Sequence, residues 1–146
     1  MDKGSLLPNE HHVIRHVRKT RLRRDENDNV IGFLPQAFAL RENEESLSVN
    51  QLEYFNGDLD ARIRLSILLY RNTFDIKKSC AFAIGNVGKI KEISQQNSAS
   101  VRIVYSPSDE IPNHSDIRRL PREDFALLEA LALDAFTSIV FNSDIP

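Results

Sequence analysis

Sulfur-containing residues and tryptophan are nearly absent from this chain of 146 residues, which has one Cys, one Met and no Trp. A single thiol, Cys80, excludes an internal disulfide and any cysteine-rich zinc site. Because Cys80 lies in the apolar sequence CAFAI, we expect it to be buried and structural. The chain also lacks a run of roughly 18 to 20 apolar residues, the length that crosses a bilayer, and residues 2–10 have no apolar signal core. These absences predict a cytoplasmic protein with no membrane contact.

The composition that remains is typical of one folded domain. Hydrophobic residues make up 41% of the chain and charged residues 27%, which argues against a disordered protein. A length of 146 residues is enough for one buried core. The net charge of −2 is too small for the whole molecule to attract DNA, which argues against non-specific DNA packaging.

Positive charge is concentrated near one end of the chain. The sequence HHVIRHVRKTRLRR, residues 11–24, holds nine His, Lys and Arg residues in fourteen positions. Residues 1–24 carry seven Lys and Arg against two Asp and Glu, a balance of +5, whereas residues 25–146 carry twelve against nineteen, a balance of −7. This division indicates an anionic partner for the basic end, or a pairing of that end with the acidic stretch Glu42–Glu45.

The order of apolar patterns predicts an α+β fold. We expect one domain over residues 11–146, preceded by a flexible lead-in over residues 1–10, in which Gly and Pro interrupt any periodic pattern. The domain is expected to contain a small mixed β-sheet covered by two main helices. The expected strands lie near residues 11–19, 47–49, 80–84 and 101–105, and the expected helices near residues 59–71 and 122–140.

Several local patterns support these boundaries. The helix at 59–71 has apolar residues spaced at three and four, and Asp58 or Asp60 can cap it. Asn50 followed by Glu53 resembles an N-cap pattern, so a brief helix is expected directly after the strand at 47–49. A short helix is expected near residues 87–93. Residues 106–121 contain three prolines and predict an ordered loop or a set of turns.

The basic run is the main candidate for a binding surface. A strand would project alternate cations toward one side, where each could contact an anionic group. The candidate binding residues are Arg15, Arg18, Arg21, Arg23 and Arg24, with nucleic acid as one partner class for residues 15–24. The run has no aromatic residue on which bases could stack, so contact with a protein or self-association is favoured over nucleic acid. A purely solvated face is the remaining alternative.

Catalytic residues are harder to place. The candidates are His16, Ser48, Glu53 and His114. Of the three clustered histidines, His11, His12 and His16, at most two fit on one side of a strand, so no metal site is expected. His114 lies in the sequence IPNHSDIRRLP, where the adjacent Ser115 and Asp116 are badly placed for a catalytic relay. We therefore interpret His114 as a residue that fixes a loop or contacts a partner.

The sequence matches two known functional motifs only in part. Transferases of the ADP-ribosyl class use an Arg or His on an early strand, then a Ser, then a Glu, and Arg15, Ser48 and Glu53 have this order. Common residue types give such an order often by chance. The sequence AIGNVGKI, residues 83–90, resembles a phosphate loop, but Ile90 stands where a Ser or Thr hydroxyl is needed. Gly85 and Gly88 are better explained by a turn between a strand and a helix, and no cofactor is expected.

The segment RHVRKTRLRRDENDNVIGFLPQAFALRENEESLSVNQLEYF, with FAIGNVGKIK and IPNHSDIRRLP, resembles a group of small, largely uncharacterised bacterial proteins. That group is loosely associated with conflict or defence-type gene clusters. The resemblance implies no activity for any residue. The leading hypothesis is a non-enzymatic interaction or accessory protein, in a bacterial conflict or defence system, that uses the basic element and the His114 loop as contact surfaces. The alternatives are a small enzyme acting on a nucleotide or nucleic acid, and a nucleic-acid-binding module.

Overall fold

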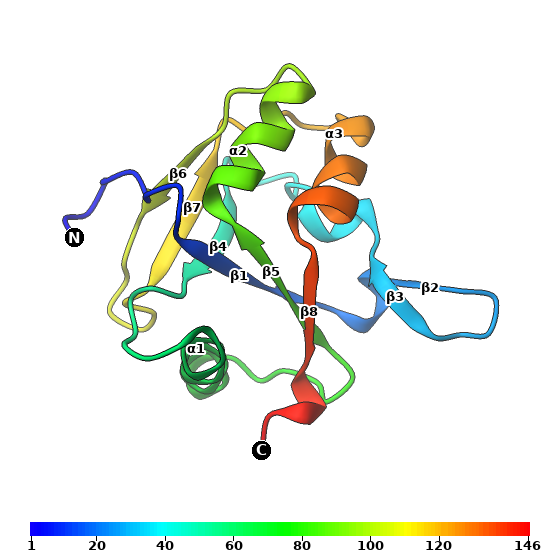
Figure 1. Cartoon of the computed structure of the whole chain (residues 1–146), viewed down its shortest axis with the longest axis horizontal. Helices are drawn as coiled ribbons and strands as arrows, with labels where there is room; N and C mark the ends of the chain where they lie inside the picture. The colour runs from blue at the N-terminus through cyan, green and yellow to red at the C-terminus, as the bar shows by residue number, and fades with distance from the viewer.

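The computed structural model describes residues 1–146 as one α+β domain built on a six-stranded sheet (Figure 1). The strand order is β6-β7-β4-β1-β5-β8, and every neighbouring pair is antiparallel. The strands are β1 (His12–Val17), β4 (Leu47–Gln51), β5 (Ala81–Asn86), β6 (Arg102–Tyr105), β7 (His114–Arg118) and β8 (Ser138–Phe141). The expected α+β class is thus confirmed, although the sheet is larger than expected and purely antiparallel rather than mixed.

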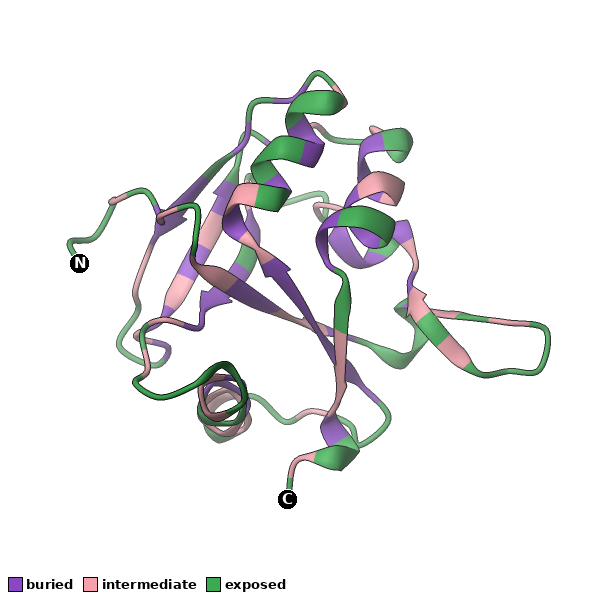
Figure 2. Cartoon of the chain, in the orientation of Figure 1, coloured by how far each residue is buried: buried purple, intermediate pink, exposed green.

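Helices cover the two faces of this sheet. Helix α1 (Leu59–Thr73) lies on one face, and α2 (Val87–Gln96) and α3 (Phe125–Ala130) lie on the other (Figure 1). A π-helical turn, Leu131–Ala135, extends α3. Strands β2 (Leu22–Arg24) and β3 (Val30–Phe33) form a separate hairpin that projects from the domain, and most of its residues are exposed or half-buried (Figure 2). No helix has both the length and the apolar character needed to span a membrane.

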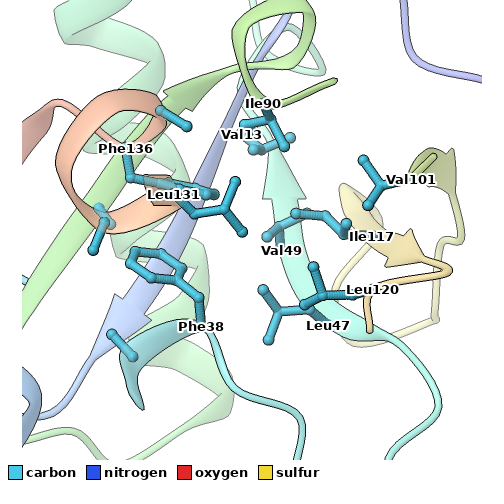
Figure 3. Close-up of a cluster of buried hydrophobic side chains, with 14 of the residues drawn as sticks. Val13, Phe38, Leu47, Val49, Ile90, Val101, Ile117, Leu120, Leu131 and Phe136 are labelled. Carbon is cyan, nitrogen blue, oxygen red and sulfur yellow. The ribbon is translucent and has the colours of Figure 1, made fainter. Parts of the chain in front are cut away.

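The main core lies between the sheet and the pair α2 and α3. It is a cluster of 26 buried residues, and its aromatic centre is the stacked pair Phe38 and Phe136, whose ring centroids are 4.4 Å apart (Figure 3). On the α1 face a smaller cluster has seven buried residues, including Ile67 and Cys80. Strand alternation divides β1 between them, because Val13 and Val17 belong to the large cluster and Ile14 to the small one.

Strand β5 is buried on both faces, as its uninterrupted apolar sequence predicts. Gly85 in this strand has a packing role, because a Cβ there would lie 3.0 Å from the ring of Phe136. Asn86 then caps α2, with its side-chain oxygen accepting a hydrogen bond from the backbone N–H of Lys89 at 2.9 Å. The expected strand and helix in this region are confirmed, but the expected turn is wrong, because β5 runs directly into α2, with Gly85 in the strand and Gly88 in the helix.

The brief helix expected after Asn50 is wrong. Asn50 lies within β4, and residues 52–55 form turns. Glu53 does not close a capping box, because its carboxylate accepts hydrogen bonds from the backbone N–H of His12 at 2.6 Å and from His12 Nδ1 at 2.8 Å. The Glu53 side chain, which could have capped a local helix, is therefore engaged in a tertiary contact with His12. The following helix is confirmed, and Asp58 caps it.

The two expectations for the C-terminal third need correction. The presumed loop at residues 106–121 contains strand β7, in which Ser115 and Ile117 are buried by alternation. The expected helix at 122–140 begins at Phe125 but ends at Ala135, and residues 138–141 form β8 against β5. Ile139 fits the helical stripe equally well, yet it pairs with Ala83, because β-branched residues suit a sheet that offers an open edge.

Residues 1–10 are not a free lead-in along their whole length. The backbone N–H groups of Gly4 and Leu7 donate to the carbonyls of Tyr105 and Ile103 on β6, at 2.8 and 2.9 Å. Leu7 is buried in the large cluster. The N-terminal segment therefore covers the outer edge of β6, which an open strand would otherwise expose.

Candidate functional site

The site begins where β1 separates from β4. These strands pair only at Val13 with Gln51 and at Ile14 with Asn50. Beyond this point the side chain of Arg15 bridges the opening, with Nε donating to the carbonyl of Ala37 at 2.8 Å and Nη1 to the carbonyl of Ser48 at 2.7 Å. The divergence of two central strands leaves room for a cavity in the middle of the sheet, and a guanidinium is fixed at its border.

This opening is a cavity of about 360 Å³, here called the split cavity. Its size lies within the usual range for small-molecule sites, roughly 300–1,000 Å³. It brings together side chains from β1, β4, β7 and α1, namely Arg15, His16, Ser48, Asn50, Tyr70 and His114. Two carboxylates, Glu44 and Glu110, and the cation Arg41 line it as well. The split cavity is therefore polar, with its charges nearly balanced.

Several polar groups of the split cavity have no hydrogen-bonding partner in the protein. The amide side chain of Asn50 forms no such bond, and its polar atoms remain accessible from the cavity although the residue as a whole is only 9% exposed. The Nε2 atom of His16 is fully buried and also unpartnered. Buried polar groups normally find partners, since leaving one unpaired costs about 1 to 3 kcal/mol. Such groups around a cavity are the arrangement expected where a ligand supplies the missing hydrogen bonds.

The ring of His16 is neutral at physiological pH. Burial, reinforced by the charges of Arg15 and Arg18, lowers the pKa of His16 to about 4. The ring stacks on Tyr70 with centroids 5.4 Å apart and meets the edge of Phe82 at 5.6 Å. Burial raises the pKa of Tyr70, so its hydroxyl stays protonated. His16 and Tyr70 therefore present uncharged hydrogen-bonding groups on aromatic rings.

A second cavity of about 270 Å³ adjoins the first on the other side of Arg15. Four arginines line it and no carboxylate does, so it is called the arginine cavity: Arg15, Arg18, Arg21 and Arg41. A third space of about 820 Å³, the outer cavity, has Arg18, Lys19 and Lys77 beside the aromatic rings of Tyr70 and Phe74. His16 and Arg41 line all three cavities, which shows that they are contiguous.

The structure divides the predicted binding residues into two groups. Arg15, Arg18 and Arg21 lie in the cavities, and none forms an ion pair. Arg23 and Arg24 belong to the hairpin, where they pair with Glu129 and Asp28. None of the basic run pairs with the acidic stretch Glu42–Glu45. Burial lowers the pKa of Arg15 to about 10, against the opposing effect of Glu44, so its guanidinium keeps its charge at neutral pH.

Three of the four catalytic candidates line the split cavity, but no relay connects them. No hydrogen bond joins Ser48 to His16 or His114. His114 lies in β7 rather than in a loop, and its Nδ1 donates to the carbonyl of Ser106 at 2.8 Å. Glu53 is outside the cavity, where it holds His12 and lies 3.7 Å from Arg62. The Arg, Ser and Glu order of the ADP-ribosyl class is thus not assembled into one site.

The remaining sequence motifs have structural explanations. His11 accepts a hydrogen bond at Nδ1 from the Gln51 amide at 2.8 Å, and no three His, Cys, Asp or Glu side chains gather to hold a metal. In the segment that resembles a phosphate loop, the backbone N–H of Gly88 donates to the carbonyl of Asn9 at 2.9 Å. Because that donor is already used, the start of α2 is not a phosphate cradle.

The sequence interpretation missed Arg41, Asn50, Tyr70 and Phe74 as site residues. Asn50 was assigned to a helix cap and Tyr70 to the buried stripe of α1, and both are common roles for those residue types. Phe74 follows directly on α1, and its 45% exposure, unusual for a phenylalanine, is visible only in the fold. Arg41 becomes recognisable only when β1 and the loop before β4 lie side by side.

Comparison of the chain with protein-family models, with curated proteins and with solved structures gives no match.

Proposed function

We propose that this protein is a binding module, an accessory protein rather than an enzyme, that holds an anionic group of its partner or ligand in the arginine cavity. The observation that carries the proposal is the meeting of four arginines with no carboxylate among them. Gathering like charges raises the free energy of the folded protein unless an anion lies among them. Arginine also suits phosphate and carboxylate groups, because its planar guanidinium donates two parallel hydrogen bonds.

Binding accounts for the geometry better than catalysis. A nucleophile needs a base within hydrogen-bonding reach, and Ser48 has none. Arg15 supports binding in particular, because its two hydrogen bonds to carbonyls fix the guanidinium before any ligand arrives. Fixed donors lose less conformational entropy when they bind an anion. The His114 end of the split cavity provides the second contact surface.

Isothermal titration calorimetry with inorganic pyrophosphate tests this proposal. The wild type should bind, with an affinity that falls as salt rises, and the double variant Arg18→Ala, Arg21→Ala should bind at least about tenfold more weakly, because charge-assisted hydrogen bonds contribute roughly 1.5 to 3 kcal/mol each. Arg102→Ala is the matched control, since Arg102 is exposed on β6 and forms no ion pair. No binding by the wild type, or equal losses in the double variant and the control, would contradict the proposal.

A further inference from the structure

We propose further, on the basis of the proposed function, that the anion is the phosphate of a nucleotide whose base enters the split cavity. The two cavities that meet at Arg15 differ in charge in the way such a ligand requires. In the split cavity Arg15 and Arg41 are balanced by Glu44 and Glu110, whereas the arginine cavity adds Arg18 and Arg21 and is lined by no carboxylate. A ligand with a neutral, polar part in the split cavity and an anionic part in the arginine cavity therefore matches both.

The hydrogen-bonding groups of the split cavity match the edge of a base. An asparagine amide offers one acceptor and two donors, and amides of this kind pair with the complementary edges of bases. The Asn50 amide is nine-tenths buried and has no protein partner, and the buried Nε2 of His16 has none either. Because the His16 ring is neutral, it adds a hydrogen-bonding group without adding charge, which suits an uncharged heterocycle.

Aromatic side chains stand beside these polar groups. The rings of His16, Tyr70 and Phe74 follow one another, with centroids 5.4 Å apart for the first pair and 4.6 Å for the second. Phe74 is 45% exposed where the split and outer cavities meet. Bases stack on exposed aromatic rings of this kind next to arginine. The basic run has no stacking residue of its own, and the fold supplies two from the end of α1.

A free nucleotide and a nucleotide within a single strand share this base and phosphate chemistry. The outer cavity distinguishes them, because it adds Lys19 and Lys77 to Arg18 and Arg41, with Asp75 as its one carboxylate, and so offers cations for the phosphates of neighbouring nucleotides. A strand would therefore use the outer cavity, and a mononucleotide would leave it unused.

The test compares the affinities of inorganic pyrophosphate, the four ribonucleoside diphosphates, a phosphoserine peptide, and single-stranded RNA and DNA of ten nucleotides. At least one nucleoside diphosphate should bind tenfold or more tightly than pyrophosphate. Asn50→Leu and Phe74→Ala should remove that preference and leave pyrophosphate binding unchanged. Tyr54→Ala is the control for Phe74→Ala, because Tyr54 is also 45% exposed but lies outside the cavities.

Each outcome has a distinct meaning. Equal binding of nucleotides and pyrophosphate, or tighter binding of the phosphoserine peptide, overturns the nucleotide assignment and leaves the anion-binding function standing. No binding of any probe overturns both. Tenfold tighter binding of the ten-nucleotide strands than of any nucleotide, lost in Lys19→Ala, Lys77→Ala, identifies the strand as the source, and equal binding identifies the free nucleotide. If circular dichroism shows that Asn50→Leu does not fold, the Phe74→Ala variant, which changes an exposed residue, still tests the nucleotide assignment.

Discussion

The two faces of the sheet differ in how closely they are packed and in whether their polar groups have hydrogen-bonding partners. On the α2 and α3 face, 26 buried residues fill the space with apolar side chains around Phe38 and Phe136 (Figure 3). On the α1 face only seven residues form the cluster, and the split and outer cavities open beside it, lined by His16 and by the aromatic rings of Tyr70 and Phe74, while the arginine cavity adjoins them at the end of β1, next to Val17 and Ala37 of the large cluster. The comparison indicates that the face covered by α2 and α3, here called the closed face, supplies most of the stability. The α1 face, here called the open face, carries binding groups that cost stability.

The largest expected effect comes from opening the closed face. Phe136 is 1% exposed and stacked on Phe38, so Phe136→Ala should lower the free energy of unfolding by about 3 to 5 kcal/mol through lost burial and a residual cavity. Phe74→Ala on the open face should cost less than about 1 kcal/mol, since its ring is already partly hydrated. Urea unfolding of both variants measures this contrast. Similar losses in the two variants would show that the faces do not differ as described.

The same contrast explains what could be predicted from the sequence. Segments buried on both faces, such as β5, and segments with a strong helical stripe, such as α1, follow from apolar patterns alone. The strands β7 and β8 do not, because prolines around β7 favour a loop and the spacing of β8 fits a helix, whereas their pairing with β4 and β5 joins segments distant in sequence. Ile139 illustrates the difficulty, since its spacing fits the apolar stripe of α3, yet it lies in β8 and pairs with Ala83 of β5.

The sequence predicted part of the candidate site, namely the arginines of the basic run and the cavity residues Ser48 and His114. Arg15, Arg18 and Arg21 could be selected by charge, but the same reasoning selected Arg23 and Arg24, which the hairpin pairs with Glu129 and Asp28. Whether an arginine forms an ion pair depends on acidic side chains elsewhere in the fold. Its neighbours in the sequence do not reveal which acidic side chains those are. The divergence of β1 from β4, which creates the split cavity, has no local sequence signature.

A second prediction concerns pH and the open face. The pKa of His16 is about 4 in the folded protein and about 6.5 in the unfolded chain, so protonation favours unfolding. The contribution of neutral His16 is fully present above pH 6.5 and is lost progressively as the pH falls toward 4. Partial solvent screening limits the loss to about 1 to 2 kcal/mol. Urea unfolding at pH 7.5, 5.5 and 4.5 should show a decline that is shallower in His16→Phe; parallel declines would place the pH sensitivity elsewhere.

The smallest expected effect separates two buried asparagines on the open face. Asn113 is 1% exposed, and its Nδ2 donates to the Gln51 carbonyl at 3.0 Å and to Ser66 Oγ at 3.2 Å. Asn113→Leu should therefore destabilise the protein by leaving the Gln51 carbonyl unpaired. The amide of Asn50 has no partner to lose, so Asn50→Leu should raise the free energy of unfolding by up to about 1 kcal/mol in the absence of ligand. A gain in stability together with a loss of nucleotide binding would show that Asn50 is kept for binding at the expense of folding, whereas a loss of stability like that of Asn113→Leu would show that its amide supports the fold.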